Sequence, residues 1–125
     1  MGVAYHAHYL VWFEIGRTEW LRGNGTDYRR LEQEGIFLPV VEVGVRYASP
    51  AGYDDELELE TRLQEVGASR VRFGYRLVRP ADGRELATGF TVHATVDSRT
   101  RPRRLPAELR QRLLAGLAAP RADFV

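Results

Sequence analysis

Residues 1–22 read MGVAYHAHYLVWFEIGRTEWLR, and this stretch decides the fold. From Tyr9 to Arg22 the apolar side chains recur at helical spacing and share one broad face. They are Tyr9, Leu10, Trp12, Phe13, Ile15, Trp20 and Leu21. Glycine and asparagine at 23–25 accept the left-handed backbone that ends a helix. A helix this apolar is not expected at a surface, so the stretch predicts a sheet that wraps around it.

The remaining chain changes from helical to strand periodicity after Gly35. A short helix, capped by Thr26 or Asp27, precedes this change. Strands are expected at residues 37–46, 57–63, 71–77 and 86–96, because apolar and charged side chains alternate there. Asp82-Gly83 predicts a hairpin turn between the last two of these strands. The pattern predicts an antiparallel sheet that is covered on one face.

Three further expectations concern the strands and the chain's end. The inward face of the fourth strand is expected to consist of Leu86, Thr88, Phe90, Val92, Ala94 and Val96. A closing amphipathic helix is expected at 106–119, opened by a proline, with residues 122–125 loose. In the first helix, Glu14 with Arg17 and Glu19 with Arg22 are spaced for surface ion pairs.

The composition indicates one ordinary globular domain, residues 1–125. Eighteen basic residues, all of them arginine, oppose 17 acidic ones, and a net charge of +1 gives no argument for nucleic acid or an anionic membrane as partner. The absence of cysteine excludes disulfides and cysteine nucleophiles. No apolar run approaches the roughly 20 residues of a membrane span, and no signal-peptide pattern opens the chain, so a cytoplasmic location is expected.

Four segments in this order carry a resemblance to a known family. They are GVAYHAHYLVWFEIGRTEWLR (2–22), PAGYDDELELETRL (50–63), SRVRFGYRLVR (69–79) and DGRELATGFTVHATVD (82–97). The sequence resembles the acyl-CoA thioesterases of the hotdog fold, most of all the 4-hydroxybenzoyl-CoA thioesterase group, from Gly2 to about Pro106. The resemblance implies an α+β hotdog fold, in which an antiparallel sheet wraps around a long central helix.

The family's motif also has a part that this sequence does not show. The family carries a catalytic acidic residue three places before the glycine that matches Gly2, and that place falls before Met1. We therefore expect Met1 to be an internal methionine of a longer protein with a first strand ahead of it. The alternative is a chain that begins at Met1 and has lost the carboxylate.

The resemblance implies where the site lies. It places the oxyanion-binding backbone amide at His6, where the helix begins and its dipole adds to the effect. The candidate catalytic residues are His6 and Tyr5, and the candidate substrate-binding residues are Gly2, Val3, Tyr9, Ser69 and Arg70. From the residues alone, the favoured interpretation of His6 is a polar residue at a helix entrance, with a catalytic or polarising role as the alternative, and Tyr9 is favoured as a packing residue. His6 and His8 are spaced poorly for chelation on a helix, so no metal is expected, and no cofactor is expected either.

The function implied is hydrolysis of an acyl-CoA thioester to a free acid and coenzyme A. The alternative is a non-catalytic hotdog protein that binds or scaffolds acyl-CoA or acyl-carrier protein. The family implies a homo-oligomer, a dimer or homotetramer, with active sites at subunit interfaces. The arginines at 99, 101, 103 and 104 either hold coenzyme A phosphates or form a solvated loop.

Overall fold

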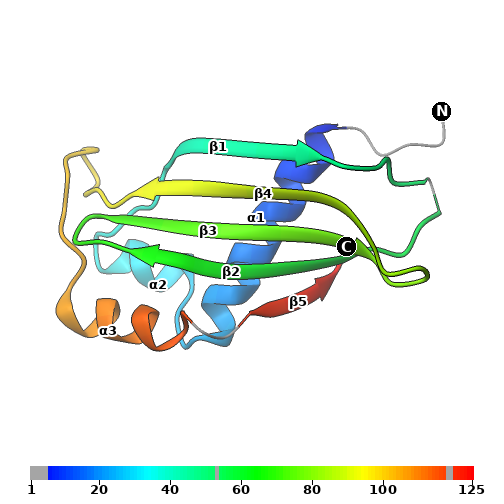
Figure 1. The fold of residues 1–125 in the computed structure, drawn as a ribbon. Helices are drawn as coiled ribbons and strands as arrows, with labels where there is room; N and C mark the ends of the chain where they lie inside the picture. Colours follow the sequence, from blue (N-terminus) through cyan, green and yellow to red (C-terminus); the bar gives the residue numbers. More distant parts are fainter. Residues whose placement is uncertain (1–5, 53, 118–119) are drawn as a thin grey trace.

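The computed structural model describes residues 6–52, 54–117 and 120–125, with side chains from His8 onward. Its elements are α1 (His6–Gly23), α2 (Tyr28–Gln33), β1 (Val40–Tyr47), β2 (Glu58–Val66), β3 (Arg70–Arg79), β4 (Arg84–Ala94), α3 (Ala107–Ala115) and β5 (Arg121–Phe124). The strands form one antiparallel sheet in the order β1-β4-β3-β2-β5 (Figure 1). The architecture is α+β, as expected from the sequence.

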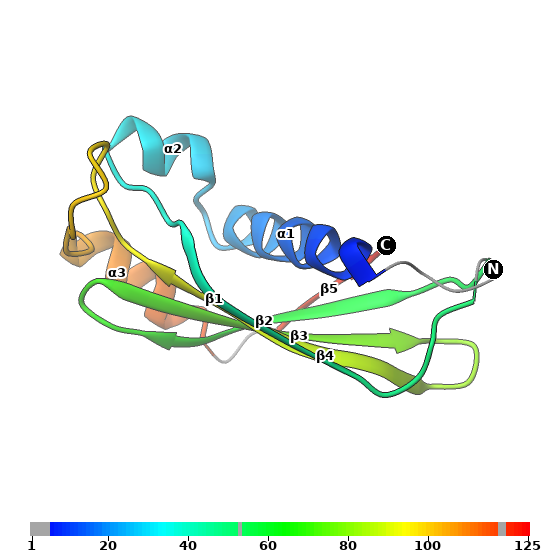
Figure 2. The same cartoon turned by 90° about the horizontal axis from the view of Figure 1, so that it is seen from above.

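The long helix α1 lies against one face of the sheet, and α2 lies on the same side (Figure 2). The approach is close because a glycine stands where helix and sheet meet. A Cβ on Gly16 would come within 2.3 Å of the Thr61 hydroxyl and 2.7 Å of a Leu59 methyl group. The core also contains Phe13 and Trp20 of α1, which are 1% and 0% exposed.

Side chains form hydrogen bonds with the backbone at the start and end of α2 and just after α1. Asp27, one of the two expected caps, accepts a hydrogen bond from the backbone N–H of Arg30 at 2.8 Å and starts α2. Arg103 donates to the carbonyl of Glu34 at the end of α2, and Arg112 of α3 donates to the carbonyl of Gly25 at 3.1 Å. These guanidinium groups satisfy carbonyls that lack helical partners and join segments far apart in the sequence.

The predicted inward face is confirmed for β2 and β3 and is wrong for most of β4. A register shift opposite Leu77 and Val78 buries Leu86 and Ala87 in succession. Beyond this bulge the helix-facing residues are Gly89, Thr91, His93 and, after the strand, Thr95. The expected inward residues Thr88, Phe90, Val92 and Ala94 therefore face away from α1.

The end of the chain is a strand and is not loose. Residues 121–124 pair antiparallel with the edge of β2, and Val125 donates its N–H to the carbonyl of Leu57 at 3.1 Å. Among the residues that the structure describes, the sheet therefore has five strands where the sequence indicated four. Hydrogen bonds to an otherwise open edge order this short segment, although only four residues form the strand.

Candidate functional site

A chain of hydrogen bonds between buried side chains connects the sheet to α1. His93 is fully buried, and its Nδ1 lies 3.0 Å from the carbonyl oxygen of Leu38. A carbonyl only accepts, so Nδ1 carries the proton and Nε2 accepts from the Thr91 hydroxyl at 2.8 Å. Thr91 then accepts from the Tyr75 hydroxyl at 2.6 Å. The Tyr75 oxygen is left to accept a hydrogen bond from Arg17.

This environment shifts the pKa values of the buried groups. Burial lowers the pKa of His93 to about 4, with a smaller contribution from the positive charge of Arg17, although the bond to Leu38 opposes the shift. Burial raises the pKa of Tyr75 to about 12. At neutral pH His93 is uncharged and Tyr75 keeps its proton. The direction of every bond in the chain is therefore fixed.

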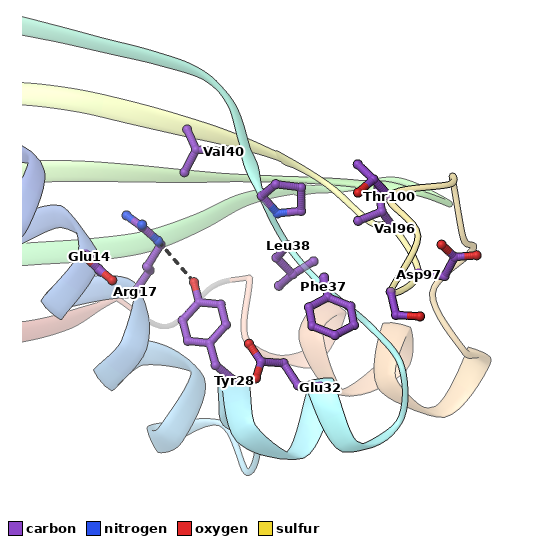
Figure 3. A pocket seen from close by; sticks show the side chains of 12 residues that line it. Glu14, Arg17, Tyr28, Glu32, Phe37, Leu38, Val40, Val96, Asp97 and Thr100 are labelled. Atoms are coloured by element: carbon purple, nitrogen blue, oxygen red, sulfur yellow. Dashed lines mark hydrogen bonds between the residues drawn. The ribbon is translucent and has the colours of Figure 1, made fainter.

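Arg17 forms the end of the chain that faces a hollow. Its Nε donates to the hydroxyl of Tyr28 on α2 at 3.1 Å (Figure 3). Burial lowers the pKa of Arg17, but the hydroxyls of Tyr75 and Tyr28 outweigh this effect, and its pKa lies above the ordinary value. No carboxylate of the described residues forms an ion pair with Arg17. The guanidinium is held by neutral hydroxyls and keeps its charge.

The hollow at Arg17 has a volume of about 600 Å³. One wall is apolar and consists of Phe37, Leu38, Pro39, Val40 and Val96. Three carboxylates, those of Glu14, Glu32 and Asp97, line the hollow together with Arg17 (Figure 3). Asp97 is held by Arg101, whose backbone N–H contributes most to lowering its pKa and whose side chain lies 3.2 Å away. The acidic lining disfavours an anionic ligand and suits a neutral hydrogen-bond acceptor against Arg17.

The predicted residues before and at the start of α1 are described only in part. Gly2, Val3 and Tyr5 lie outside the described residues, and so does the side chain of His6. His6, of which the structure describes the backbone, is the first residue of α1. The first turn of α1 has no acidic residue. The helix expected from Tyr9 to Arg22 is confirmed, whereas the site predicted at its start stays a prediction.

Tyr9 lies in the core near this end of α1. It is 2% exposed, and its ring packs edge-on against Tyr47 with ring centroids 5.0 Å apart. Burial raises its pKa, with a further contribution from Tyr47. Tyr47 ends β1, so the contact fixes the start of α1 beside that end of the sheet.

The start of β3, at Arg70, lies at the opposite end of the sheet from the start of α1 (Figure 1), and Ser69 directly precedes it in the sequence. Arg70 begins β3, whereas Leu77 of the same strand shares its row, through Ala87, with Tyr47. Seven residues of extended strand between Arg70 and Leu77 span roughly 23 Å. One chain does not bring these two predicted residues near His6 or Tyr9.

The expected charge pairs have different outcomes. Glu19 and Arg22 form the expected pair at 2.7 Å. Arg17 does not pair with Glu14, because the hydroxyls of Tyr28 and Tyr75 engage it. Arg101 and Arg103 of the arginine run have partners within the protein, Asp97 and the carbonyl of Glu34.

Sequence reasoning missed the polar chain itself. Thr91 and His93 occupy positions two apart on a strand, which puts them on one face. Polar residues at this spacing, inside a segment otherwise rich in β-branched side chains, were the feature of the sequence that could have indicated a buried polar pair. Their partners on other elements, Leu38 and Arg17, are not deducible from strand spacing.

In the part of the chain that the structure describes, no group of three or more His, Cys, Asp or Glu side chains gathers in a way that suits a metal ion. Among the same residues, no helix has the length and apolar character to span a membrane.

Comparisons with known proteins show the family of this chain. The sequence model of the thioesterase-like superfamily matches residues 1–113. The putative acyl-CoA thioesterase YneP of Bacillus subtilis (strain 168) is 33% identical over 97 residues, which cover 78% of this chain and 70% of that protein. The acyl-CoA thioester hydrolase YbgC of Escherichia coli O6:H1 is 32% identical over 109 residues, covering 86% of this chain and 81% of YbgC.

Solved structures show the same architecture. The hypothetical protein TT1821 from Thermus thermophilus superposes with a TM-score of 0.85 at 36% identity, covering 93% of this chain and 88% of that one. DHNA-CoA thioesterase from Staphylococcus aureus superposes with a TM-score of 0.84 at 25% identity, covering 95% and 81%. The chain belongs to the thioesterase-like superfamily and has the α+β hotdog fold. Its relatives support thioesterase activity in general.

The buried neutral state of His93 predicts a pH dependence of stability. The unfolded chain binds a proton at the ordinary histidine pKa of 6.5, whereas the folded protein resists protonation until about pH 4. The free energy of unfolding should therefore fall as the pH drops from 6.5 to 4, by on the order of 3 kcal/mol from this group. Urea unfolding across this pH range measures the change.

The variant His93→Gln isolates this contribution, because glutamine has no group that titrates in the range. We expect its stability to depend less steeply on pH than that of the wild type between pH 6.5 and 4. His8→Gln is the matched control, since His8 is exposed on α1, and it should keep the wild-type dependence. Equal slopes for the wild type and His93→Gln would show that His93 titrates normally in the fold.

Proposed function

We propose that this protein hydrolyses an acyl-CoA thioester to the free acid and coenzyme A. Membership of the thioesterase-like superfamily and the similarity to YneP and YbgC support the proposal. The observation that carries it in this chain is the start of α1. An 18-residue helix begins at His6 with no acidic side chain in its first turn to offset the helix dipole. The backbone N–H groups of its first turn, together with the helix dipole, suit a developing oxyanion.

The proposed reaction is direct attack on the thioester or attack through an acyl-enzyme. In the direct route a water oxygen bonds to the carbonyl carbon, the carbon–sulfur bond breaks, and the thiolate takes up a proton. The backbone amide at His6 binds the oxyanion, and a carboxylate or the His6 side chain takes the proton from water. Tyr5 is proposed to assist at the carbonyl. The proposed substrate-binding residues are Gly2, Val3, Tyr9, Ser69 and Arg70.

The hollow at Arg17 is proposed to take a part of acyl-CoA remote from the thioester. Arg17 lies eleven residues along α1 from His6, which is about 16 Å of helix. Its guanidinium faces an apolar wall and three carboxylates, so the group it holds is a neutral acceptor. An amide carbonyl of the pantetheine arm or an oxygen of the acyl group has this chemistry.

The open edge of β1 supports the proposed homo-oligomer. Val40, Val41 and Val43 are 43%, 52% and 45% exposed on this edge strand, and Leu10 and Val11 of α1 are 46% and 52% exposed. An apolar edge strand with unpaired backbone groups is a template for pairing with another strand. We propose that two copies pair through β1 and form a continuous sheet.

Thiol release from a panel of acyl-CoAs, with short, long and aromatic acyl groups, tests the reaction. We expect release of free coenzyme A above the rate without enzyme for at least one member. The assay is run on the 125-residue chain and on a chain extended upstream in its reading frame. Turnover by either supports the hydrolase. Saturable acyl-CoA binding without turnover by both would favour the scaffold alternative.

Arg17→Gln tests the hollow. The substitution removes the charged hydrogen bond that Arg17 is proposed to donate to a neutral acceptor of the substrate. This bond is made in both the ground state and the transition state, so KM should rise about tenfold while kcat stays within twofold. Glu32→Gln is the matched control, since Glu32 lines the same hollow but is exposed. Its KM should stay within twofold. A fall in kcat at unchanged KM for Arg17→Gln would contradict the assignment.

Val43→Asp tests the proposed interface. A charge placed on the β1 edge should shift the protein toward monomer, because it would be buried without a partner on pairing. Sedimentation velocity at several protein concentrations measures this shift. Phe124→Asp is the control on the opposite edge strand, where Phe124 is 66% exposed. If Phe124→Asp dissociates the oligomer and Val43→Asp does not, the interface lies at β5.

A further inference from the structure

A second hollow, of about 440 Å³, lies on the face of the sheet turned away from α1 and α2. Figure 2 shows that both helices lie on the other side of the sheet. The strand registers place its side chains in rows across the sheet. One row consists of Gly44, Phe90 and Gly74, which pair across β1, β4 and β3. The two glycines leave the Phe90 ring without side-chain neighbours on β1 and β3 in this row, which continues on β2 with Arg62, and this creates the hollow.

Neighbouring side chains occupy the space above both glycines. A Cβ on Gly44 would come within 2.3 Å of the Phe90 ring, and one on Gly74 within 2.1 Å of the Gln64 amide nitrogen. The side chains of Phe90 and Gln64 therefore extend over the backbone of the two glycines instead of pointing straight away from the sheet. They form part of the lining, and the hollow is a shaped feature of the surface.

Two arginines flank Phe90. Arg72 stacks its guanidinium 4.0 Å from the ring centroid and donates from Nε to the Gln64 oxygen at 2.9 Å. These contacts fix the plane of the Arg72 guanidinium, whose terminal nitrogens have no recorded partner among the described residues. Arg46 lies in the next row beside Thr88, and its guanidinium has no recorded partner there either.

The lining is free of carboxylates. It consists of Gly44, Val45, Arg46, Gln64, Arg72, Thr88, Gly89 and Phe90. Two other arginines of this face are neutralised, because Arg62 pairs with Glu60 at 2.9 Å and Arg76 with Glu85 at 2.8 Å. Two positive charges, one hydroxyl and one amide therefore line the hollow, and no carboxylate lines it with them.

Two acidic residues share the row of Arg72 across the sheet, Glu42 through Val92 and Glu65 directly opposite Arg72. Glu42 and Glu65 line a separate, smaller hollow of about 210 Å³ that also touches Arg72. Neither forms an ion pair with Arg72 among the described residues. Their charges reduce the positive potential on the side of Arg72 that faces the smaller hollow. The side of Arg72 toward Arg46 and Thr88 is therefore the favourable place for an anion.

We propose that this outer hollow binds a phosphate group, held by Arg46 and Arg72 with Thr88 and Gln64 as further hydrogen-bonding partners. Guanidinium groups match phosphate oxygens in geometry, and a phosphate dianion is balanced by two of them. The hollow at Arg17, with three carboxylates around one arginine, has the opposite preference. The outer hollow shares no lining residue with the hollow at Arg17 and lies on the other face of the sheet.

Titration with inorganic pyrophosphate in low-chloride buffer tests the site, followed by isothermal calorimetry. We expect saturable binding to the wild type and a dissociation constant at least tenfold higher for Arg46→Gln and for Arg72→Gln, because each loses a charge-assisted hydrogen bond. Arg62→Gln is the matched control, an arginine on the same face outside the lining. Its affinity should stay within threefold.

The outcomes separate the proposal from general charge attraction. No saturable binding, equal weakening by Arg62→Gln, or unchanged affinity in both Arg46→Gln and Arg72→Gln would each overturn it. Arg46→Gln guards against a folding defect, because Arg46 is exposed and Arg72 packs on Phe90. Displacement of pyrophosphate by coenzyme A would identify the coenzyme's phosphates as the source of the ligand. Failure of coenzyme A to compete, with pyrophosphate still bound, would assign the site to a different phosphate compound.

Discussion

The closeness of α1 to the sheet is the constraint on which the rest of the structure depends. Gly16 on the helix and Gly89 on β4 each lack the side chain that would separate the two layers. A Cβ on Gly89 would come within 2.5 Å of the Phe13 ring. Because the layers touch, Phe13 stacks on Tyr75 with ring centroids 4.2 Å apart and planes 7° from parallel. Arg17, one helical turn further on, then reaches the Tyr75 hydroxyl.

The guanidinium of Arg17 is held close to the sheet by hydrogen-bond acceptors that are themselves uncharged. The chain from Arg17 through Tyr75, Thr91 and His93 ends at the carbonyl of Leu38, which can only accept. Each hydroxyl along it both donates and accepts, so none is left unsatisfied. A proton added to His93 would reverse one bond and leave two donors facing each other. Burial and network direction therefore both favour the neutral imidazole.

The sequence was sufficient for elements whose periodicity and packing agree. The spacing of Phe13 and Trp20 and the alternation along β2 and β3 predicted α1 and two strands correctly. The prediction failed in β4, because the bulge at Leu86 changes which alternate residues face the helix, and Phe90 and Val92 are apolar on the outer face. It failed at Ala122 to Val125, because only the edge of β2 makes those residues a strand. Arg17 was assigned to Glu14 by helical spacing, whereas the closer acceptors come from α2 and β3.

Charge is distributed unevenly in a chain whose net charge is only +1. The hollow beside α1 has three carboxylates around one arginine, and the outer hollow has two arginines and no carboxylate. A net charge near zero excludes a long-range field that attracts polyanions, but it does not describe a surface recess a few ångströms across. A coenzyme with a neutral pantetheine arm and charged phosphates presents both chemistries in one molecule. The two faces of this sheet are therefore suited to different ligand groups, and recognition depends on local pairing of charges rather than on their sum.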